Sequence, residues 1–327
     1  MHTKRNKLRN PMNKIKLIGS LVVAMVLSVA VSAQTLEEVN EKFNEGGAAL
    51  QAKDYAKAGA LFLEVVQQGA VVGADAAGTV QNAKQYAVQS FFRQGQTLAA
   101  ANDLDNAIPA LTKASELGEL YGVANVGRQA TQMLGQVYFA MGANAYNTED
   151  YPKAIEIFGQ GYAADPTNTD MALNLARSYN KQGDLAKAVE VYDAVIALED
   201  RHSRYVEPAK EARAEKATAV LVKASEAAAA NNLEEVVALT DLIPEDPTGA
   251  LMRLQVANNN KDYRSVIQYG EAAAALQTED DKKSDAYFLL GAAYQNQDNK
   301  AKAIESFRKV TAGANAAQAR SLISSLQ

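Results

Sequence analysis

The chain has 327 residues, of which 48% are hydrophobic and 22% are charged, and this composition excludes an intrinsically disordered polymer. It contains no cysteine, which excludes disulfide bonds and a lipid anchor on an N-terminal cysteine. Alanine is abundant, proline is scarce at seven residues, and no alternating β-branched run stands out, so we expect an all-α protein.

Residues 1–33 have the features of a secretory signal peptide. Lys14 and Lys16 precede an apolar run over residues 17–31, and small residues follow up to Ala33. We expect cleavage between Ala33 and Gln34, and an exported protein that is periplasmic or secreted. A retained membrane anchor is the less favoured alternative, because the run is shorter than the roughly 20 residues that span a bilayer.

The charge of the mature chain argues against nucleic acid as a partner. Residues 1–33 hold six of the 33 Lys and Arg residues and no Asp or Glu, so their removal changes the net charge from −5 to −11. An acidic surface repels phosphate groups. We expect residues 34–327 to form one folded domain without a membrane span, and the sequence leaves its oligomeric state open.

Residues 138–200 hold two copies of one helix–turn–helix unit, 34 residues apart. A period of this length is typical of stacked repeats. The markers of the first copy are Gly142, Asp150, Tyr151, Ala154, Phe158 and Pro166, and those of the second are Ala176, Asp184, Leu185, Ala188, Tyr192 and Asp200.

Each marker has a physical role. The small residue lies on the first helix, where we expect a neighbouring backbone to approach closely. The Asp is the N-cap of the second helix. The following Ala lets the two helices cross tightly, and the aromatic residue one turn later fills the gap between repeats. Pro166 cannot continue a helix, so it separates one unit from the next.

This pattern of small residue, Ala, aromatic residue and Pro, with steps of twelve, four and eight residues, resembles the tetratricopeptide repeat family. The resemblance implies a right-handed α-solenoid of antiparallel helix pairs that binds other proteins. The charged N-terminus suggests an exported bacterial member. The family's clamp for C-terminal carboxylates is absent, because Phe92, Gln96, Ala140, Asp170 and Asn174 occupy its positions.

The capping position extends the pattern to about seven repeats. Asp or Asn stands at Asp54, Asp103, Asp150, Asp184, Asn232, Asp262 and Asn299. The fifth and sixth repeats are degenerate, because Thr240 and Gly270 are poor replacements for the aromatic residue. Residues 314–327 carry Leu322, Ile323 and Leu326 at helical spacing, which predicts a capping helix over the last repeat.

The spacing between capping residues predicts three long hairpins. Three of the six intervals, at 49, 47 and 48 residues, exceed the usual period. We expect about two extra turns on each of the two helices that flank these gaps, so that they stay matched in length. The expected hairpin tips lie near residues 69–73, 118–122 and 200–203, and we expect all three to project from one edge of the solenoid.

The sequence offers little material for catalysis, so we expect no enzyme, no catalytic residue, no cofactor and no metal. His202 is the single histidine of the mature chain, which excludes the usual His-type zinc site and leaves very little material for a Ser–His–Asp arrangement. Two carboxylates, Asp103 and Asp150, lie at capping positions, and the acidic cluster of residues 279–281 starts a polar turn. We therefore favour a structural role for these carboxylates over a general acid–base pair.

The first helix of each repeat lines the concave groove in the resembled family, which indicates a candidate binding surface. An apolar column flanked by amides suits an extended peptide or an amphipathic helix. The alternative is that the column belongs to the core between helices. The candidate groove residues are Phe92, Gln96, Phe139, Tyr146, Leu173, Arg177, Asn180, Lys181, Leu251, Gln255, Asn258, Phe288 and Gln295.

The sequence therefore predicts a non-enzymatic scaffold of the bacterial cell envelope that binds a protein or peptide on its concave surface. The alternatives are an all-α enzyme that acts on glycans, which the absence of Trp disfavours, and a glycan-binding protein. A deep pocket with two facing carboxylates would favour the enzyme.

The repeat register makes Phe158 a core residue. Removing a buried phenylalanine side chain costs about 3–5 kcal/mol, so Phe158→Ala should clearly lower the melting temperature in a thermal unfolding experiment. An unchanged melting temperature would show that the register is wrong.

Overall fold

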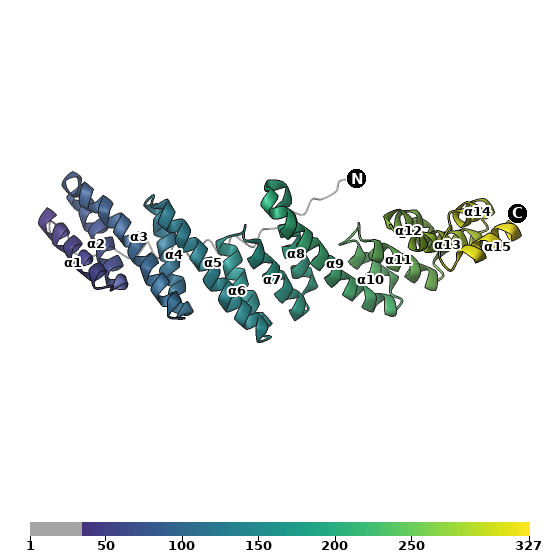
Figure 1. Ribbon diagram of the computed structural model, residues 1–327, viewed down its shortest axis with the longest axis horizontal. Coiled ribbons are helices and arrows are strands. Elements are labelled where there is room, and N and C mark those ends of the chain that lie inside the picture. Colours follow the sequence, from purple (N-terminus) through teal and green to yellow (C-terminus); the bar gives the residue numbers. More distant parts are fainter. Residues whose placement is uncertain (1–34) are drawn as a thin grey trace, which may run out of the picture. The chain divides into compact units, whose positions relative to one another are not determined.

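The computed structural model describes residues 35–327, which form fifteen α-helices, three 3-10 turns and no β-strand (Figure 1). The predicted signal peptide lies outside the described residues. In chain order the α-helices are α1 (Leu36–Gln51), α2 (Tyr55–Val72), α3 (Ala77–Ala100), α4 (Leu104–Leu120), α5 (Ala124–Asn147), α6 (Tyr151–Ala164), α7 (Thr169–Gln182), α8 (Leu185–Ile196), α9 (Val206–Ala229), α10 (Leu233–Thr240), α11 (Pro247–Asn259), α12 (Tyr263–Leu276), α13 (Asp280–Asn296), α14 (Lys300–Arg308) and α15 (Ala316–Leu326).

The helices divide into two compact units. The first holds residues 35–101 and 109–130 of the described chain, and the second holds residues 102–108 and 131–327. Within each unit consecutive helices pack side by side, from α1 to α3 in the first and from α6 to α15 in the second. Helices α7, α9, α11 and α13 also contact one another in turn, so they form one layer, which we call the inner layer. The predicted all-α architecture of stacked helix pairs is confirmed.

All seven predicted capping residues cap the helix that follows them. Each side-chain oxygen accepts a hydrogen bond from the backbone N–H three residues later, at 3.4 Å for Asp103 and at 3.2 Å for the other six. The second helices therefore begin where the sequence predicts, because an N-cap satisfies a backbone donor that the helix cannot.

The residue before each cap has a left-handed backbone. Its φ is +62° at Lys53, +59° at Asn102, +61° at Glu149, +89° at Gly183, +54° at Asn231, +56° at Lys261 and +57° at Asp298. This conformation closes the preceding helix: the N–H of Asp54, for example, donates to the carbonyl of Ala49 at 2.9 Å. The capping residue thus ends one helix through its backbone N–H and begins the next helix through its side chain.

The glycine on the first helix of the first, third and seventh repeats admits a phenylalanine ring from its own repeat, and Gly95 of the second repeat admits the side chain of Leu111. A Cβ atom placed on Gly142 would lie 2.6 Å from Cε1 of Phe158, and one on Gly291 would lie 2.6 Å from Cδ1 of Phe307. Both rings are at most 1% exposed. Our expectation that this position admits a neighbouring backbone was wrong at Gly142 and Gly291, where the phenylalanine ring of the second helix fills the space beside the first. At Gly95 the backbone nitrogen of Leu111 does come close, 3.3 Å from a Cβ placed there.

The fifth and sixth repeats keep their cores by other means. Thr240 is 1% exposed; its hydroxyl donates to the carbonyl of Val236 at 2.6 Å and accepts from Nε of Arg253. At Gly270 the sizes are exchanged, since a Cβ there would lie 2.9 Å from Cδ1 of the buried Leu290 on α13. The next helix supplies the volume that the aromatic residue supplies elsewhere.

The three predicted long hairpins exist, and two of them are made of extended helices. Helices α2 and α3 have 18 and 24 residues, and α4 and α5 have 17 and 24. The third hairpin is different, because α8 has only 12 residues whereas α9 has 24. Two 3-10 turns, η4 (Glu199–Arg201) and η5 (Ser203–Tyr205), form its tip. The expectation that both helices lengthen together is therefore wrong for this hairpin.

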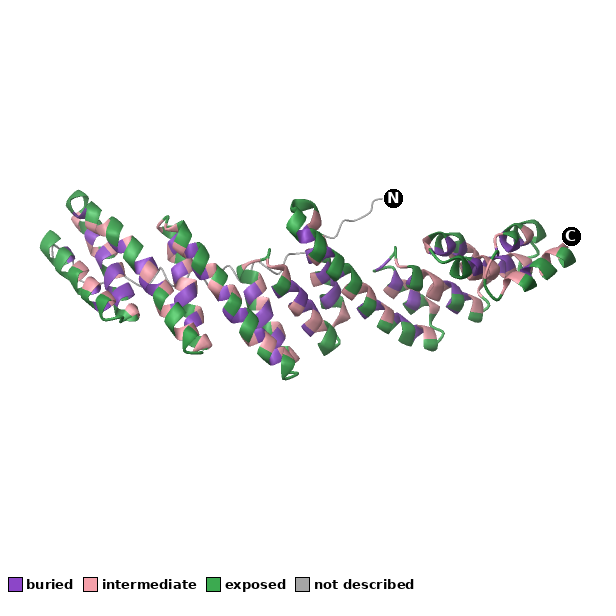
Figure 2. Cartoon of the chain, viewed as in Figure 1, coloured by how far each residue is buried: buried purple, intermediate pink, exposed green. Residues whose placement is uncertain are grey.

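The C-terminal capping helix is confirmed as α15. Its Leu322, Ile323 and Leu326 pack against a cluster that contains Phe307 and Val310. Figure 2 shows the general rule, with buried residues between neighbouring helices and exposed residues on the outer surfaces. Within residues 35–327 no helix combines the length and the apolar character needed to cross a membrane.

The contact between Gly142 and Phe158 predicts opposite effects for two alanine substitutions. Gly142→Ala should lower the free energy of unfolding by about 1–3 kcal/mol, because the methyl group overlaps the ring. Gly159→Ala is the control; its Cβ would meet no atom within 4 Å, and alanine is the better helix former by up to ~1 kcal/mol. Equal shifts in chemical denaturation would contradict the packing.

Candidate partner-binding groove

A hollow of about 220 Å³ opens beside the inner layer of the second unit. Four of the thirteen predicted groove residues line it together: Tyr146 from α5, and Arg177, Asn180 and Lys181 from α7. Tyr192 of α8 and Glu215, Thr218 and Ala219 of α9 complete the lining. First helices of three consecutive repeats therefore contribute to one surface, which we call the central groove.

The guanidinium of Arg177 is fixed by two carboxylates of α9. Its Nε lies 3.0 Å from each carboxylate oxygen of Glu215, and its Nη2 lies 2.5 Å from Oε1 of the same residue. Nη2 also donates to Glu211 at 2.6 Å. The hydrogen bond to Glu215 is the main reason why the pKa of Arg177 is raised. Arg177 therefore joins α7 to α9 and forms the floor of the groove.

Tyr192 completes this polar network from the outer helix. Its hydroxyl donates to Oε2 of Glu215 at 3.1 Å, and the side chain is 1% exposed. Burial raises the pKa of Tyr192 well above its ordinary value, and the negative charge of Glu215 raises it further. The phenol therefore stays protonated and remains a donor, and Glu215 has partners on both oxygens.

Asn180 and Lys181 differ from Arg177 because their polar ends are uncommitted. Both are exposed, and no hydrogen bond or ion pair with another of residues 35–327 engages either side chain. Tyr146 is half-buried and packs edge-on against Tyr151, with 5.6 Å between ring centroids. These three side chains are the ones that a partner would meet above the fixed floor.

A second hollow of about 230 Å³ brings Leu251 and Gln255 of α11 together with Met252 and Lys282. Its wall includes Gln277, whose side-chain amide donates to the carbonyls of Pro247 at 3.0 Å and Ala273 at 2.9 Å. This hollow is separate from the central groove and shares no lining residue with it.

The apolar column is largely part of the core. Leu173 is 3% exposed, and Phe288 packs against Phe307 at 5.7 Å between centroids. Phe139 is the exception, because 41% of it is exposed while its ring packs against Phe158 at 6.1 Å. The alternative that the sequence left open, a column belonging to the core, therefore describes Leu173 and Phe288 better than a binding surface does.

The remaining candidates lie outside the central groove. Phe92 and Gln96 belong to the first unit, where Phe92 packs against the cluster of Phe91 and Ala114 and Gln96 is exposed. Asn258 of α11 and Gln295 of α13 are half-buried in the second unit. None of these four lines a hollow with Arg177.

Sequence reasoning missed the contribution of α9. Glu211 and Glu215 lie one turn apart on the part of α9 that extends beyond the ordinary repeat. Their i, i+4 spacing places both carboxylates on one face of the helix, and this was the signal available. Both are bound to Arg177, so they differ from a pair of carboxylates poised for acid–base catalysis. Residues 35–327 also contain no group of three His, Asp or Glu side chains that could hold a metal ion.

Comparison with known families identifies the repeats. Tetratricopeptide repeat family models match residues 146–207 and residues 284–312. The first match covers most of the two copies on which the sequence pattern was recognised, and the second covers the last repeat. Residues 146–207 and 284–312 are therefore similar to tetratricopeptide repeats, which are typical of non-enzymatic scaffolds for protein–protein interaction. No curated protein matches the sequence.

Solved structures of repeat proteins are similar at low identity. A tetratricopeptide repeat protein from Parabacteroides merdae is 12% identical, covers 88% of this chain and 98% of its own, and has a TM-score of 0.26. The tetratricopeptide domain of P58(IPK) is 14% identical, with coverages of 89% and 97% and a TM-score of 0.29. The TPR2AB domain of yeast Sti1, in a complex with pHSP90, is 15% identical, with coverages of 89% and 98% and a TM-score of 0.30. Superpositions with scores this low say nothing about what this chain binds.

The network around Glu215 predicts a measurable loss of stability. Glu215→Gln removes the charge that Arg177 and Tyr192 bind, and should lower the free energy of unfolding by about 1–2 kcal/mol. Glu190→Gln on the exposed face of α8 is the matched control, with an expected change within about 0.5 kcal/mol. If urea denaturation shows the same small change for both variants, the network does not join α7 to α9.

Proposed function

We propose that this protein is a non-enzymatic scaffold that binds a segment of a partner protein, as an extended peptide or an amphipathic helix, in the central groove. The observation that carries the proposal is the convergence of Tyr146, Asn180 and Lys181 from two first helices above the fixed Arg177–Glu215 floor. A floor held by charge-assisted hydrogen bonds fixes α7 against α9 before a partner arrives, and preorganisation of the backbone lowers the cost of binding.

The chemistry of the groove suits a polypeptide. The amide of Asn180 offers both donors and an acceptor, which match the N–H and C=O groups of a peptide main chain. The exposed ring of Phe139, on α5 like Tyr146, offers apolar area, and Lys181 can pair with a carboxylate.

We place this activity at the bacterial cell envelope. The support is the signal-like pattern of residues 1–33, with Lys14 and Lys16 ahead of the apolar run and Ala33 at its end. Export followed by cleavage would leave a chain with net charge −11 that starts at Gln34.

Site-specific photocrosslinking in intact cells tests both parts of the proposal. A photoreactive residue at Asn180 should capture a specific protein, whereas one at Lys153, exposed on outer helix α6, should not. Asn180→Ala with Lys181→Ala should then weaken binding of the purified partner about tenfold or more, and Lys153→Ala should leave it unchanged.

The same crosslinked material gives the N-terminus of the mature chain by mass spectrometry, where we expect Gln34. Identical adducts at positions 180 and 153 would refute the proposal that the partner binds in the central groove. Tight binding of a glycan with no protein adduct would favour a glycan-binding protein instead.

A further inference from the structure

The second hollow, beside α11, contains a hydrogen-bond acceptor that is held in one orientation. Gln277 lines this hollow and is only 7% exposed. The NH2 group of its side chain donates to the carbonyl of Pro247 at 3.0 Å and to that of Ala273 at 2.9 Å, which uses both of its N–H groups. Turning the amide over would place its oxygen against two carbonyl oxygens, so the orientation of the amide is fixed.

The oxygen of this amide is open to the hollow. Within residues 35–327 no hydrogen bond engages Oε1 of Gln277, and protein atoms do not enclose this oxygen completely. The open space that Gln277 borders is the second hollow. A donor from outside the chain can therefore bind Oε1 without displacing a protein partner, and the hollow favours an occupant that brings an N–H or O–H group.

The rest of the hollow is apolar and carries no net charge. Leu251 and Met252 of α11 are half-buried in its wall. The two ionised side chains of its lining, Glu279 and Lys282, pair with each other at 2.7 Å. A charged occupant would find no opposite charge left over, and a purely aliphatic occupant would cover Oε1 without giving it a donor.

The volume of the hollow limits the occupant to about one side chain. It is about 230 Å³, whereas sites that enclose whole small molecules have roughly 300–1,000 Å³ and one water takes up about 30 Å³. The indole of tryptophan combines a large apolar surface with a single N–H donor and no acceptor. The thioether of Met252 adds a favourable contact with an aromatic ring. Tryptophan is therefore the side chain whose chemistry matches the hollow best.

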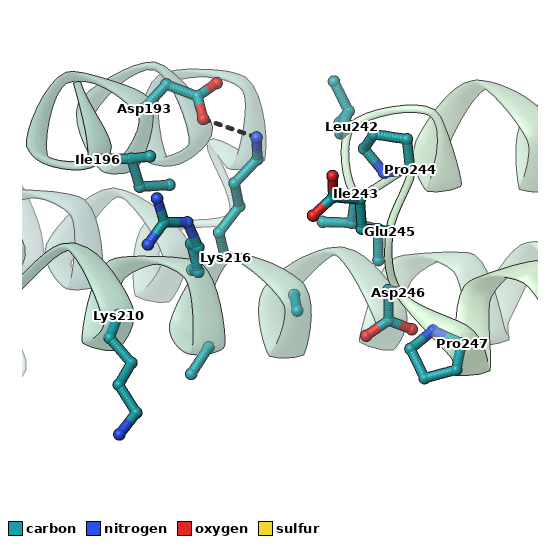
Figure 3. Close-up of a pocket in the computed structure, with 13 residues that line it drawn as sticks. Asp193, Ile196, Lys210, Lys216, Leu242, Ile243, Pro244, Glu245, Asp246 and Pro247 are labelled. Carbon is teal, nitrogen blue, oxygen red and sulfur yellow. Dashed lines mark hydrogen bonds and ion pairs between the residues drawn. The ribbon is translucent and has the colours of Figure 1, made fainter. Parts of the chain in front are cut away.

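A neighbouring cleft differs from the second hollow in its charges. Pro247 lines both, and Figure 3 shows it in the lining of the cleft of about 520 Å³ beside α9. Figure 3 also marks the ion pair between Lys216 and Asp193, at 2.6 Å. Three cations and three carboxylates line this cleft, so charge does not select one kind of partner there. The fixed acceptor distinguishes the second hollow from it.

We infer that the second hollow binds one tryptophan side chain of a partner protein, with the indole N–H donating to Oε1 of Gln277 and the ring packed against Leu251 and Met252. A buried aromatic anchor of this kind supplies a large share of the affinity of a protein interface. The hollow shares no lining residue with the central groove, so the inference does not rest on the proposed function.

Tryptophan fluorescence tests the inference with the full chain, which contains no tryptophan and gives no background of its own. The probe is a short neutral peptide of alanine and serine around one tryptophan. We expect a saturable shift of its emission to shorter wavelength, because the ring leaves water. The same peptide with 1-methyltryptophan lacks the N–H and should bind about tenfold more weakly. Gln277→Met lacks the amide oxygen and should remove this difference between the two peptides.

A matched pair of variants tests the location. Thr248→Leu adds volume at an exposed position of the second hollow and should weaken binding of the tryptophan peptide about tenfold. Thr218→Leu, the same change at an exposed position of the central groove, should leave binding unchanged.

Four outcomes would overturn the inference. They are an emission without a saturable shift, equal affinity of the methylated peptide, a difference between the peptides that persists in Gln277→Met, and a loss of binding in Thr218→Leu as large as in Thr248→Leu. Loss of the central groove's own partner would not affect it.

Discussion

In the complete repeats, a large side chain on the second helix packs against a glycine on the first helix. This contact decides how closely the two helices of a pair approach each other. Phe158 against Gly142 and Phe307 against Gly291 are the complete examples, and both rings are excluded from solvent. Because a single pair cannot cover its apolar surface, each pair stacks on the next, and α15 covers the last. Where the aromatic residue is missing, as at Gly270, a leucine from the following helix takes its place.

This packing determines where functional side chains can lie. First helices of successive repeats are neighbours, so Tyr146 of α5 and Asn180 of α7, which occupy equivalent positions, meet residues from the middle of α9 in the central groove. Helix α9 has the largest part in this arrangement. Its extension supplies Glu211 and Glu215 to the groove on one side, and Arg213 and Lys216 to α8 and the hairpin tip on the other. One lengthened helix thus supports two surfaces of different chemistry.

Features governed by local chemistry or by the spacing of the caps were predictable from the sequence, and features that depend on the short α8 were not. The seven caps followed from Asp or Asn at fixed positions, since an N-cap depends only on the next three residues. The long helices of the first two hairpins followed from the spacing. The short α8 did not, because the turns at residues 199–205 replace helix with 3-10 structure that has no comparable pattern. Four of the candidate groove residues line one hollow, but the role of Glu215 depends on a contact across 38 residues that only the true lengths of α8 and α9 reveal. Leu173 was a candidate for the binding surface because of its position on the first helix of its repeat, but it is 3% exposed. A position within the repeat does not by itself determine whether a side chain is buried.

The seven left-handed turns have a consequence for how the chain acquires its fold. Each turn is closed by bonds between residues at most five apart, and helices contact only their near neighbours within each unit. Such a molecule has low contact order, so little loop entropy is lost before stabilising contacts form. Ordering can therefore start at any well-formed hairpin and spread to either side, and a nascent chain can consolidate its first hairpins while later ones are still being synthesised.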